Sequence, residues 1–129
     1  MKSSDVKITI NSGKVKALEE EMNRALAIAM GVLQDRIREA QVIPRDTGAL
    51  QGEKFYLDDS QASNGIVRLV HEGPYARRLY YHPEYNFRTD KNPFAQGLWF
   101  SLWEEGGVYQ NEPTEFYERT LRQILKGDL

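Results

Sequence analysis

Residues 14–40 have the sequence KVKALEEEMNRALAIAMGVLQDRIREA, and this stretch decides the fold of the chain. Its apolar positions recur at steps of three and four residues, which is the spacing of one face of an α-helix. These positions are Val15, Leu18, Met22, Ala25, Ala29, Leu33, Ile37 and Ala40. A second apolar set lies beside the first and comprises Leu26, Ile28, Met30 and Val32. We therefore expect a helix about 40 Å long, at ~1.5 Å per residue, that is covered on more than one side.

Three short segments are predicted to be strands. Residues 6–10 alternate apolar and polar side chains and are rich in β-branched residues, which is typical of a strand. Residues 54–57 and 66–71 have a similar character. Asn64 and Gly65 offer the positive φ angles that a turn between the last two strands needs, although the connection is longer than a two-residue hairpin. The register of that pair stays open.

The ends of two helices can also be predicted. Ser12 is suited to cap the long helix, and Pro44 bounds it because the residue before a proline avoids the helical region. A final helix would be capped by Asn111 and would accept Pro113 in its first turn. Its apolar face would contain Tyr117, Leu121, Ile124 and Leu125.

The remaining segments complete an α+β pattern. Residues 75–80 suit a short helical turn, and residues 82–96, with two prolines and two asparagines, predict a long loop. Residues 97–103 are apolar again and suit a strand or a turn packed on the core. The order is strand, long helix, strands, aromatic loop and short helix, which indicates one α+β domain over residues 1–129.

Composition excludes several classes of site. The 129-residue chain contains no cysteine, which removes disulfides, thiolate catalysis and sulfur-based zinc sites. A net charge of −2 and a pI near 5.7 supply no global basic field for nucleic acid. No segment approaches the ~20 apolar residues that cross a bilayer, and the first residues lack the pattern of a signal peptide. We expect a protein used in a cytoplasm, with no membrane partner.

Aromatic residues gather in residues 73–103, which hold nine of the fourteen in the chain. Such a cluster is either the centre of a core or a contact surface for a partner. Arg77 and Arg78, followed by Arg88 and Lys91, give it a local positive charge. Arginine with tyrosine is typical of protein interfaces, but it is also typical of platforms that stack single-stranded nucleic acid. The acidic balance of the chain favours protein contact.

Asp46-Thr47-Gly48 matches the triplet of retroviral-type aspartic proteases, in which two subunits each supply one aspartate. That family places the triplet at the end of an apolar strand in an almost wholly β chain. Here Pro44 and Arg45 precede it, after a long helix. The alternative is a turn formed by Asp46 and Thr47, with Gly48 supplying a permissive backbone.

Other enzymatic motifs are weak or missing in the sequence. His71, His82 and Glu84 include the only two histidines, and their spacing does not match a metal-binding helix. We expect His71 to be a packed or surface residue. No glycine-rich phosphate loop or nucleophile elbow occurs. The sequence therefore predicts no enzyme, no cofactor and no metal.

Taken together, five runs of the sequence resemble a family of small minor capsid proteins of tailed phages and prophages in Gram-positive bacteria, related to the head-tail connector and tail-completion proteins of long-tailed phages. The runs are residues 43–50 (IPRDTGAL), 65–70 (GIVRLV), 74–80 (PYARRLY), 82–87 (HPEYNF) and 97–100 (GLWF). The most specific are the proline followed by Asp-Thr-Gly-x-Leu and the Pro-Tyr-Ala-Arg run. The resemblance extends over residues 14–125.

This resemblance implies a long N-terminal helix and a short C-terminal helix packed on a small curved antiparallel β-sheet. It also implies a non-enzymatic role at the neck of the virion, with assembly in the host cytoplasm. The subunits would form a ring, commonly of six, that contacts portal-adaptor, neck and tail-tube proteins. The isolated chain can still be a monomer. The acidic balance fits a ring around passing DNA, a hypothesis that a lumen lined by lysine and arginine would contradict.

The resemblance carries over no catalytic residue. Pro44, Asp46, Thr47 and Gly48 become a structural turn. The predicted subunit or partner contacts are Tyr75, Arg77, Arg78, Tyr80, Tyr85, Phe87, Trp99 and Phe100. Within this set Trp99 and Phe100, with Leu79, are expected to anchor the aromatic stretch to the core. The loop of residues 82–96 is expected to reach toward a neighbour.

Overall fold

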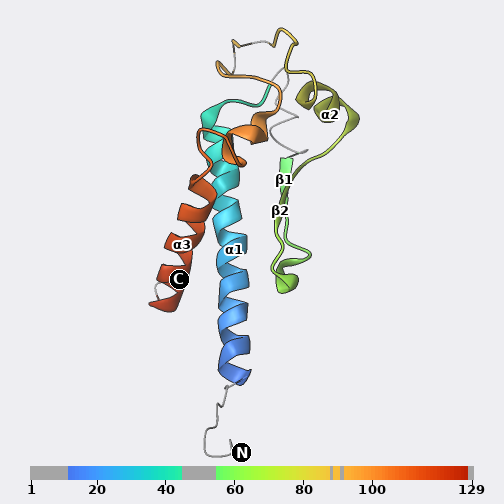
Figure 1. Ribbon diagram of the computed structural model, residues 1–129. Coiled ribbons are helices and arrows are strands. Elements are labelled where there is room, and N and C mark those ends of the chain that lie inside the picture. The colour runs from blue at the N-terminus through green and yellow to red at the C-terminus, as the bar shows by residue number, and fades with distance from the viewer. Residues whose placement is uncertain (1–11, 45–54, 88, 91, 128–129) are drawn as a thin grey trace, which may run out of the picture.

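The structure, a computed structural model, describes residues 12–44, 55–87, 89–90 and 92–127 (Figure 1). Its helices are α1 (Ser12–Ala40), α2 (Pro74–Tyr80) and α3 (Glu112–Leu125). Its strands are β1 (Phe55–Asp58) and β2 (Arg68–His71), and two short 3₁₀ helices are η1 (Ala62–Asn64) and η2 (Trp99–Trp103). The predicted α+β class is confirmed, with a long N-terminal helix, a short C-terminal helix and a small antiparallel sheet.

Helix α1 is the axis of the molecule, with α3 on one side and the β1–β2 ribbon on the other (Figure 1). Ala25 and Ala29 are buried on α1, and Thr120 and Ile124 are buried on α3. Small alanine side chains let neighbouring helices approach closely, because little volume separates the two backbones. The C-terminal helix therefore packs mainly on α1, which leaves the opposite flank of α1 to the two strands.

The ribbon is antiparallel, and its register pairs Phe55 with His71 at one end and Asp58 with Arg68 at the other. The strands predicted at residues 54–57 and 66–71 are confirmed, although β2 begins at Arg68 and not at residue 66. The strand predicted at residues 6–10 lies outside the described residues. Gly65 has a φ of +77° and follows η1, so the connection contains a 3₁₀ turn. Gln34 and Arg38 of α1 each donate a hydrogen bond of 3.2 Å to the carbonyl of Phe55, which fixes the ribbon to the helix.

The core lies beside the C-terminal half of α1, where the chain returns from β2 and α2. Its buried members are Leu33, Ile37, Val42, Ile43, Phe55, Ala76, Trp99 and Trp103. Trp99 and Phe55 are the largest side chains that are fully buried. Aromatic side chains from β1 and η2 therefore fill the space between α1 and α2.

Several local predictions need correction. Residues 97–103 were predicted as a strand or a turn, but they contain the 3₁₀ helix η2. Leu98, the residue before η2, has a left-handed backbone conformation. The predicted end of α1 at Ala40 is confirmed, and Gln41 follows it with a φ of +58°. Asn111 precedes α3, but its side chain makes no capping hydrogen bond, whereas Pro113 does occupy the first turn. Leu125 was predicted on the buried face of α3 and is exposed.

The N-terminal end of α1 extends past the end of α3 and past the tip of the ribbon (Figure 1). Farther along the helix, Asn23 donates a hydrogen bond of 3.3 Å to the carbonyl of Ser63 in η1. Residues 16–20 are all exposed. Leu18 and Met22 belong to the predicted apolar stripe, yet their exposed fractions are 45% and 39%.

Candidate interaction surface

Helix α2 presents a positively charged face because of the local order of its residues. Pro74 occupies the first turn, where its missing N–H costs no hydrogen bond. Ala76 is buried and Leu79 is half-buried, so they face the core, whereas Arg77 and Arg78 are exposed. The Pro-Tyr-Ala-Arg run therefore forms an amphipathic turn with its two arginines directed to solvent.

A pocket of about 270 Å³ opens between α2, β2 and η2. It is lined by His71, Ala76, Arg77, Tyr80, Tyr81, Trp99 and Phe100. Small-molecule sites in proteins usually measure ~300–1,000 Å³, so this pocket suits one or two side chains better than a cofactor. We call it the arginine pocket, because Arg77 is the one charged residue in its lining.

The pocket walls are held by perpendicular ring contacts. Trp99, with no exposed surface, meets the ring of Tyr80 at 4.8 Å and that of His71 at 5.1 Å, both edge to face. Tyr81 in turn meets Tyr80 at 5.1 Å and is 66% exposed. Edge-to-face pairs contribute ~0.5–1.5 kcal/mol beyond the area that they bury. The rings of Trp99 and Tyr80 thus form the inner wall of the pocket, and the ring of Tyr81 outside them is exposed to solvent.

Electrostatics in this pocket keep Tyr80 neutral. Burial raises the pKa of Tyr80 to about 12, and the nearby carboxylate of Glu104 adds to the rise through its charge and a hydrogen bond. Burial disfavours the phenolate because it removes the water that would solvate the charge. Tyr80 therefore keeps its phenol proton at physiological pH and can donate a hydrogen bond.

The predicted contact residues divide into two groups. Arg77, Arg78, Tyr80 and Phe100 lie in or beside the arginine pocket, together with Trp99. The burial of Trp99 confirms its expected role as an anchor and leaves no surface for a partner to touch, so its place among the contacts is corrected.

The second group lies in the loop after α2, outside the lining of the pocket. Tyr85 stacks on His82 at 4.6 Å and lies 6.4 Å from Phe87. The structure does not describe the side chain of Tyr75, or residues Arg88 and Lys91.

The loop of residues 82–96 is less free than its composition predicts. Asn92 is buried, and its side-chain amide donates a hydrogen bond of 2.6 Å to the carbonyl of Ile43. The backbone N–H of Gln96 donates to Val42 at 2.9 Å, and that of Leu98 donates to Tyr80 at 2.8 Å. Truncating the whole loop would therefore remove the buried Asn92 and its hydrogen bond to Ile43.

The histidines do not come together as a site. His82 lies 2.9 Å from Glu84 at the surface, and this hydrogen bond lowers the pKa of the Glu84 carboxyl. His71 stacks on Phe55 and meets the edge of Trp99, so the expectation of a packed residue is confirmed. Over the described ranges no three His, Asp or Glu side chains are grouped to hold a metal ion.

Most of the predicted turn motif lies outside the described residues. Pro44 is buried at the end of the described residues 12–44. Asp46, Thr47 and Gly48 lie outside the described residues, so both their turn assignment and their match to the protease triplet stay predictions.

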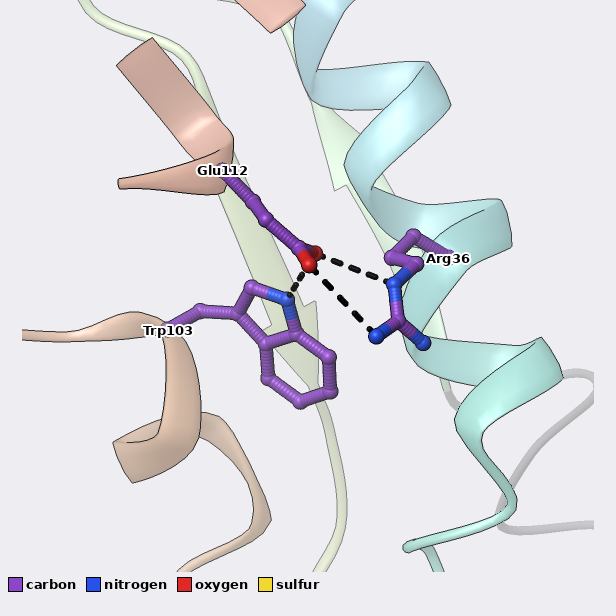
Figure 2. A network of polar contacts seen from close by, with 3 residues as sticks. All are labelled: Arg36, Trp103 and Glu112. Carbon is purple, nitrogen blue, oxygen red and sulfur yellow. Dashed lines mark hydrogen bonds and ion pairs between the residues drawn. The ribbon is translucent and has the colours of Figure 1, made fainter. Parts of the chain in front are cut away.

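A network that the sequence did not reveal joins α1, η2 and α3. Figure 2 shows Glu112, the first residue of α3, accepting hydrogen bonds from Arg36 Nε at 3.0 Å and from Trp103 Nε1 at 2.9 Å. The Arg36 guanidinium also lies over the rings of Trp103 and Tyr109, at 5.6 and 4.7 Å. These partners lie far apart in sequence, so nothing in their local pattern signals the contact. The network fixes η2, and with it the inner wall of the pocket.

Comparison with known proteins adds no relative. No family model, no curated protein and no solved structure matches this chain. Within the described residues, no helix is both long and apolar enough to span a membrane.

Proposed function

We propose that this chain is a structural protein of a tailed phage or prophage, a minor capsid or head-tail joining protein that forms a ring at the neck of the virion. The observation that carries the proposal is the partly uncovered N-terminal end of α1, where residues 16–20 are all exposed. A helix of 29 residues with Leu18 and Met22 exposed leaves apolar surface that a neighbouring subunit can cover.

The runs that carry the resemblance add support, because two of them meet at one place. Residues 74–80 form α2, and residues 97–100 lead into η2. Between them they supply most of the lining of the arginine pocket, namely Ala76, Arg77, Tyr80, Trp99 and Phe100. Arginine and tyrosine at such a rim are the residues most enriched at protein interfaces. The proposed partners are other copies of this chain and the portal-adaptor, neck and tail-tube proteins.

The decisive experiment deletes the gene from an inducible prophage and examines the particles by electron microscopy. We expect DNA-filled heads and separate tails, because a missing neck ring prevents their union. A plasmid copy of the gene should restore joined virions. Normal virions from the deletion strain would refute the proposal.

A matched variant separates this proposal from the aspartic protease alternative. Asp46→Asn keeps a residue that favours turns but removes the carboxyl that a protease needs. We expect this variant to restore virions as well as the parent gene does. Failure of the variant to restore them, together with cleavage of a peptide substrate at acid pH by the parent protein alone, would favour the protease.

A further inference from the structure

Two partly uncovered surfaces of this chain are complementary in polarity and charge. The first, which we call the α1 tip, comprises the exposed Leu18, Glu19 and Met22 and the half-exposed Glu21. Glu19 and Met22 also line a hollow together with Ser63, Asn64 and Gly65 of the same chain. At about 100° per residue, Leu18 and Met22 lie about 40° apart on the helix, and each glutamate lies about 60° outside this pair, one on either side. Lys16 and Arg24 fall on the far side of the helix. The tip is therefore an apolar stripe bordered by two acids.

The second surface is the arginine pocket with its rim. Its lining is mostly aromatic and includes Arg77 and the exposed Tyr81, whereas Arg78 is exposed on α2 but is not a lining residue. Glu104 is the acid near this wall, and it interacts with the hydroxyl of Tyr80. The outward charge on α2 is therefore positive, around a hollow of about 270 Å³ that is open to solvent.

The two surfaces match group by group. A leucine or methionine side chain suits a pocket with aromatic walls, and the methionine sulfur makes favourable contacts with ring edges. Glutamates beside the stripe would meet the arginines beside the pocket, and arginine–carboxylate pairs are among the stronger hydrogen-bonded contacts. The acids beside the stripe and the positive charge of Arg77 in the pocket, with Arg78 next to it in sequence, also favour one orientation of the helix on the pocket.

The surfaces lie toward opposite ends of the molecule. Figure 1 shows the N-terminal half of α1 extending away from the end at which α2 lies. A copy that places its tip on the pocket of a second copy thus keeps its own pocket free for a third. Such a contact joins two different patches, and it produces a ring when the rotation between copies closes.

We propose that copies of this chain associate head to tail, with the α1 tip of one copy seated in the arginine pocket of the next. This contact rests on the proposed function, because it supplies the interface that a neck ring requires. A second copy is favoured over a different partner because both halves of the contact are present, complementary and uncovered on this one chain.

Cross-linking of two single-cysteine variants tests this contact. The chain has no cysteine, so Leu18→Cys and Tyr81→Cys each introduce one thiol. Equal amounts are mixed at high concentration and treated with a short bis-maleimide reagent. We expect the mixed dimer to exceed either homodimer at least tenfold, because only the mixed pair brings the tip to the pocket. The control replaces Tyr81→Cys with Val108→Cys, at a side chain that is 75% exposed and in neither surface.

Charge reversal tests the pairing of acids with arginines in the same assay. Glu19→Lys with Glu21→Lys in the Leu18→Cys chain, or Arg77→Glu with Arg78→Glu in the Tyr81→Cys chain, should each lower the mixed product at least tenfold. Combining the two reversed chains should restore it, because the charges are again opposite. Circular dichroism and the melting temperature show whether each variant is folded.

Other outcomes would overturn the contact. Mixed dimers no more abundant than homodimers or the Val108→Cys control would exclude it, and an excess of homodimers would indicate a two-fold contact. If the contact fails but the gene deletion still yields unjoined heads and tails, the proposed function stands without it. If the contact is found and the deletion strain makes normal virions, the function fails and the association stays.

Discussion

The two halves of α1 share one apolar periodicity but differ in what surrounds them. From Ala25 onward, Ala25, Ala29, Leu33 and Ile37 are all buried. Nearer the N-terminus, Leu18 and Met22 continue the same stripe into solvent. A helical pattern thus identifies the apolar face, but the rest of the chain decides how much of that face is covered.

The covered part of α1 contributes to the stability of the monomer, whereas its exposed part is available for association. Burying an apolar side chain contributes ~1.5–3 kcal/mol relative to leaving it exposed, so the C-terminal half holds the fold together. The N-terminal half adds little to the stability of the monomer. Its exposed apolar residues, Leu18 and Met22, lie where a second molecule can bury them.

The largest expected effect comes from the same substitution in each half. Leu33→Ala should lower the free energy of unfolding by ~2–5 kcal/mol, because it leaves a cavity in the core. Leu18→Ala should lower it by no more than ~1 kcal/mol, because 45% of the residue is already exposed to solvent. Urea denaturation of both variants measures the two values. Equal losses would show that the N-terminal half is covered within the monomer.

The next effect concerns the arginines of α1. Arg36→Ala breaks the ion pair with Glu112 and leaves that carboxylate partly buried, so we expect a loss of ~1.5–3 kcal/mol. Arg24→Ala, in the N-terminal half and exposed, should cost no more than ~0.5 kcal/mol. Glu112→Gln is the control, since its amide oxygen can still accept from Trp103 Nε1 while the charge is lost. An Arg36→Ala variant as stable as the parent would contradict the role assigned to this network.

The sequence predicted the elements that depend on local pattern. The apolar spacing in residues 14–40 was enough for α1, and β-branched residues with Asn64 and Gly65 were enough for the ribbon. It missed η2, because Trp99, Phe100, Leu102 and Trp103 form an apolar run without a distinctive period.

The contacts of the site were harder to predict. Arg77 and Arg78 were identified as exposed candidates, but the uncovered Leu18 and Met22 looked like ordinary core positions. The partners of Arg36 lie up to 76 residues away, and a surface arginine on a helix gives no sign of which carboxylate it will meet. Burial of Asn92 in a proline-rich loop was likewise invisible in the local composition.

The loop after α2 likewise contains buried and exposed residues. Substitutions there should have a smaller effect on the free energy of unfolding. Asn92→Ala leaves the buried carbonyl of Ile43 without its 2.6 Å hydrogen bond, which should cost ~1–3 kcal/mol. Asn86→Ala, at an exposed position of the same loop, should change stability by no more than ~0.5 kcal/mol. Thermal unfolding of the pair measures the difference. Similar melting temperatures would mean that the loop is not anchored at Asn92.

The smallest expected effect is the pH dependence of stability that comes from Tyr80, in the inner wall of the arginine pocket. The folded-state pKa of Tyr80, about 12, lies above its ordinary value of 10.0, so the folded protein keeps the phenol proton where the unfolded chain has lost it. The contribution of Tyr80 to the free energy of unfolding is therefore fully present below pH ~10, and it is lost as the pH rises toward ~12.

Tyr80→Phe should therefore reduce the alkaline loss of stability, measured as the urea midpoint at about pH 9 and about pH 11. Glu104→Gln should reduce it only in part, because burial is the larger cause of the shift. An alkaline decline that is identical in Tyr80→Phe and the parent would mean that water reaches this side of the wall. The inner wall would then be as open as the rim that Arg77 and Tyr81 form.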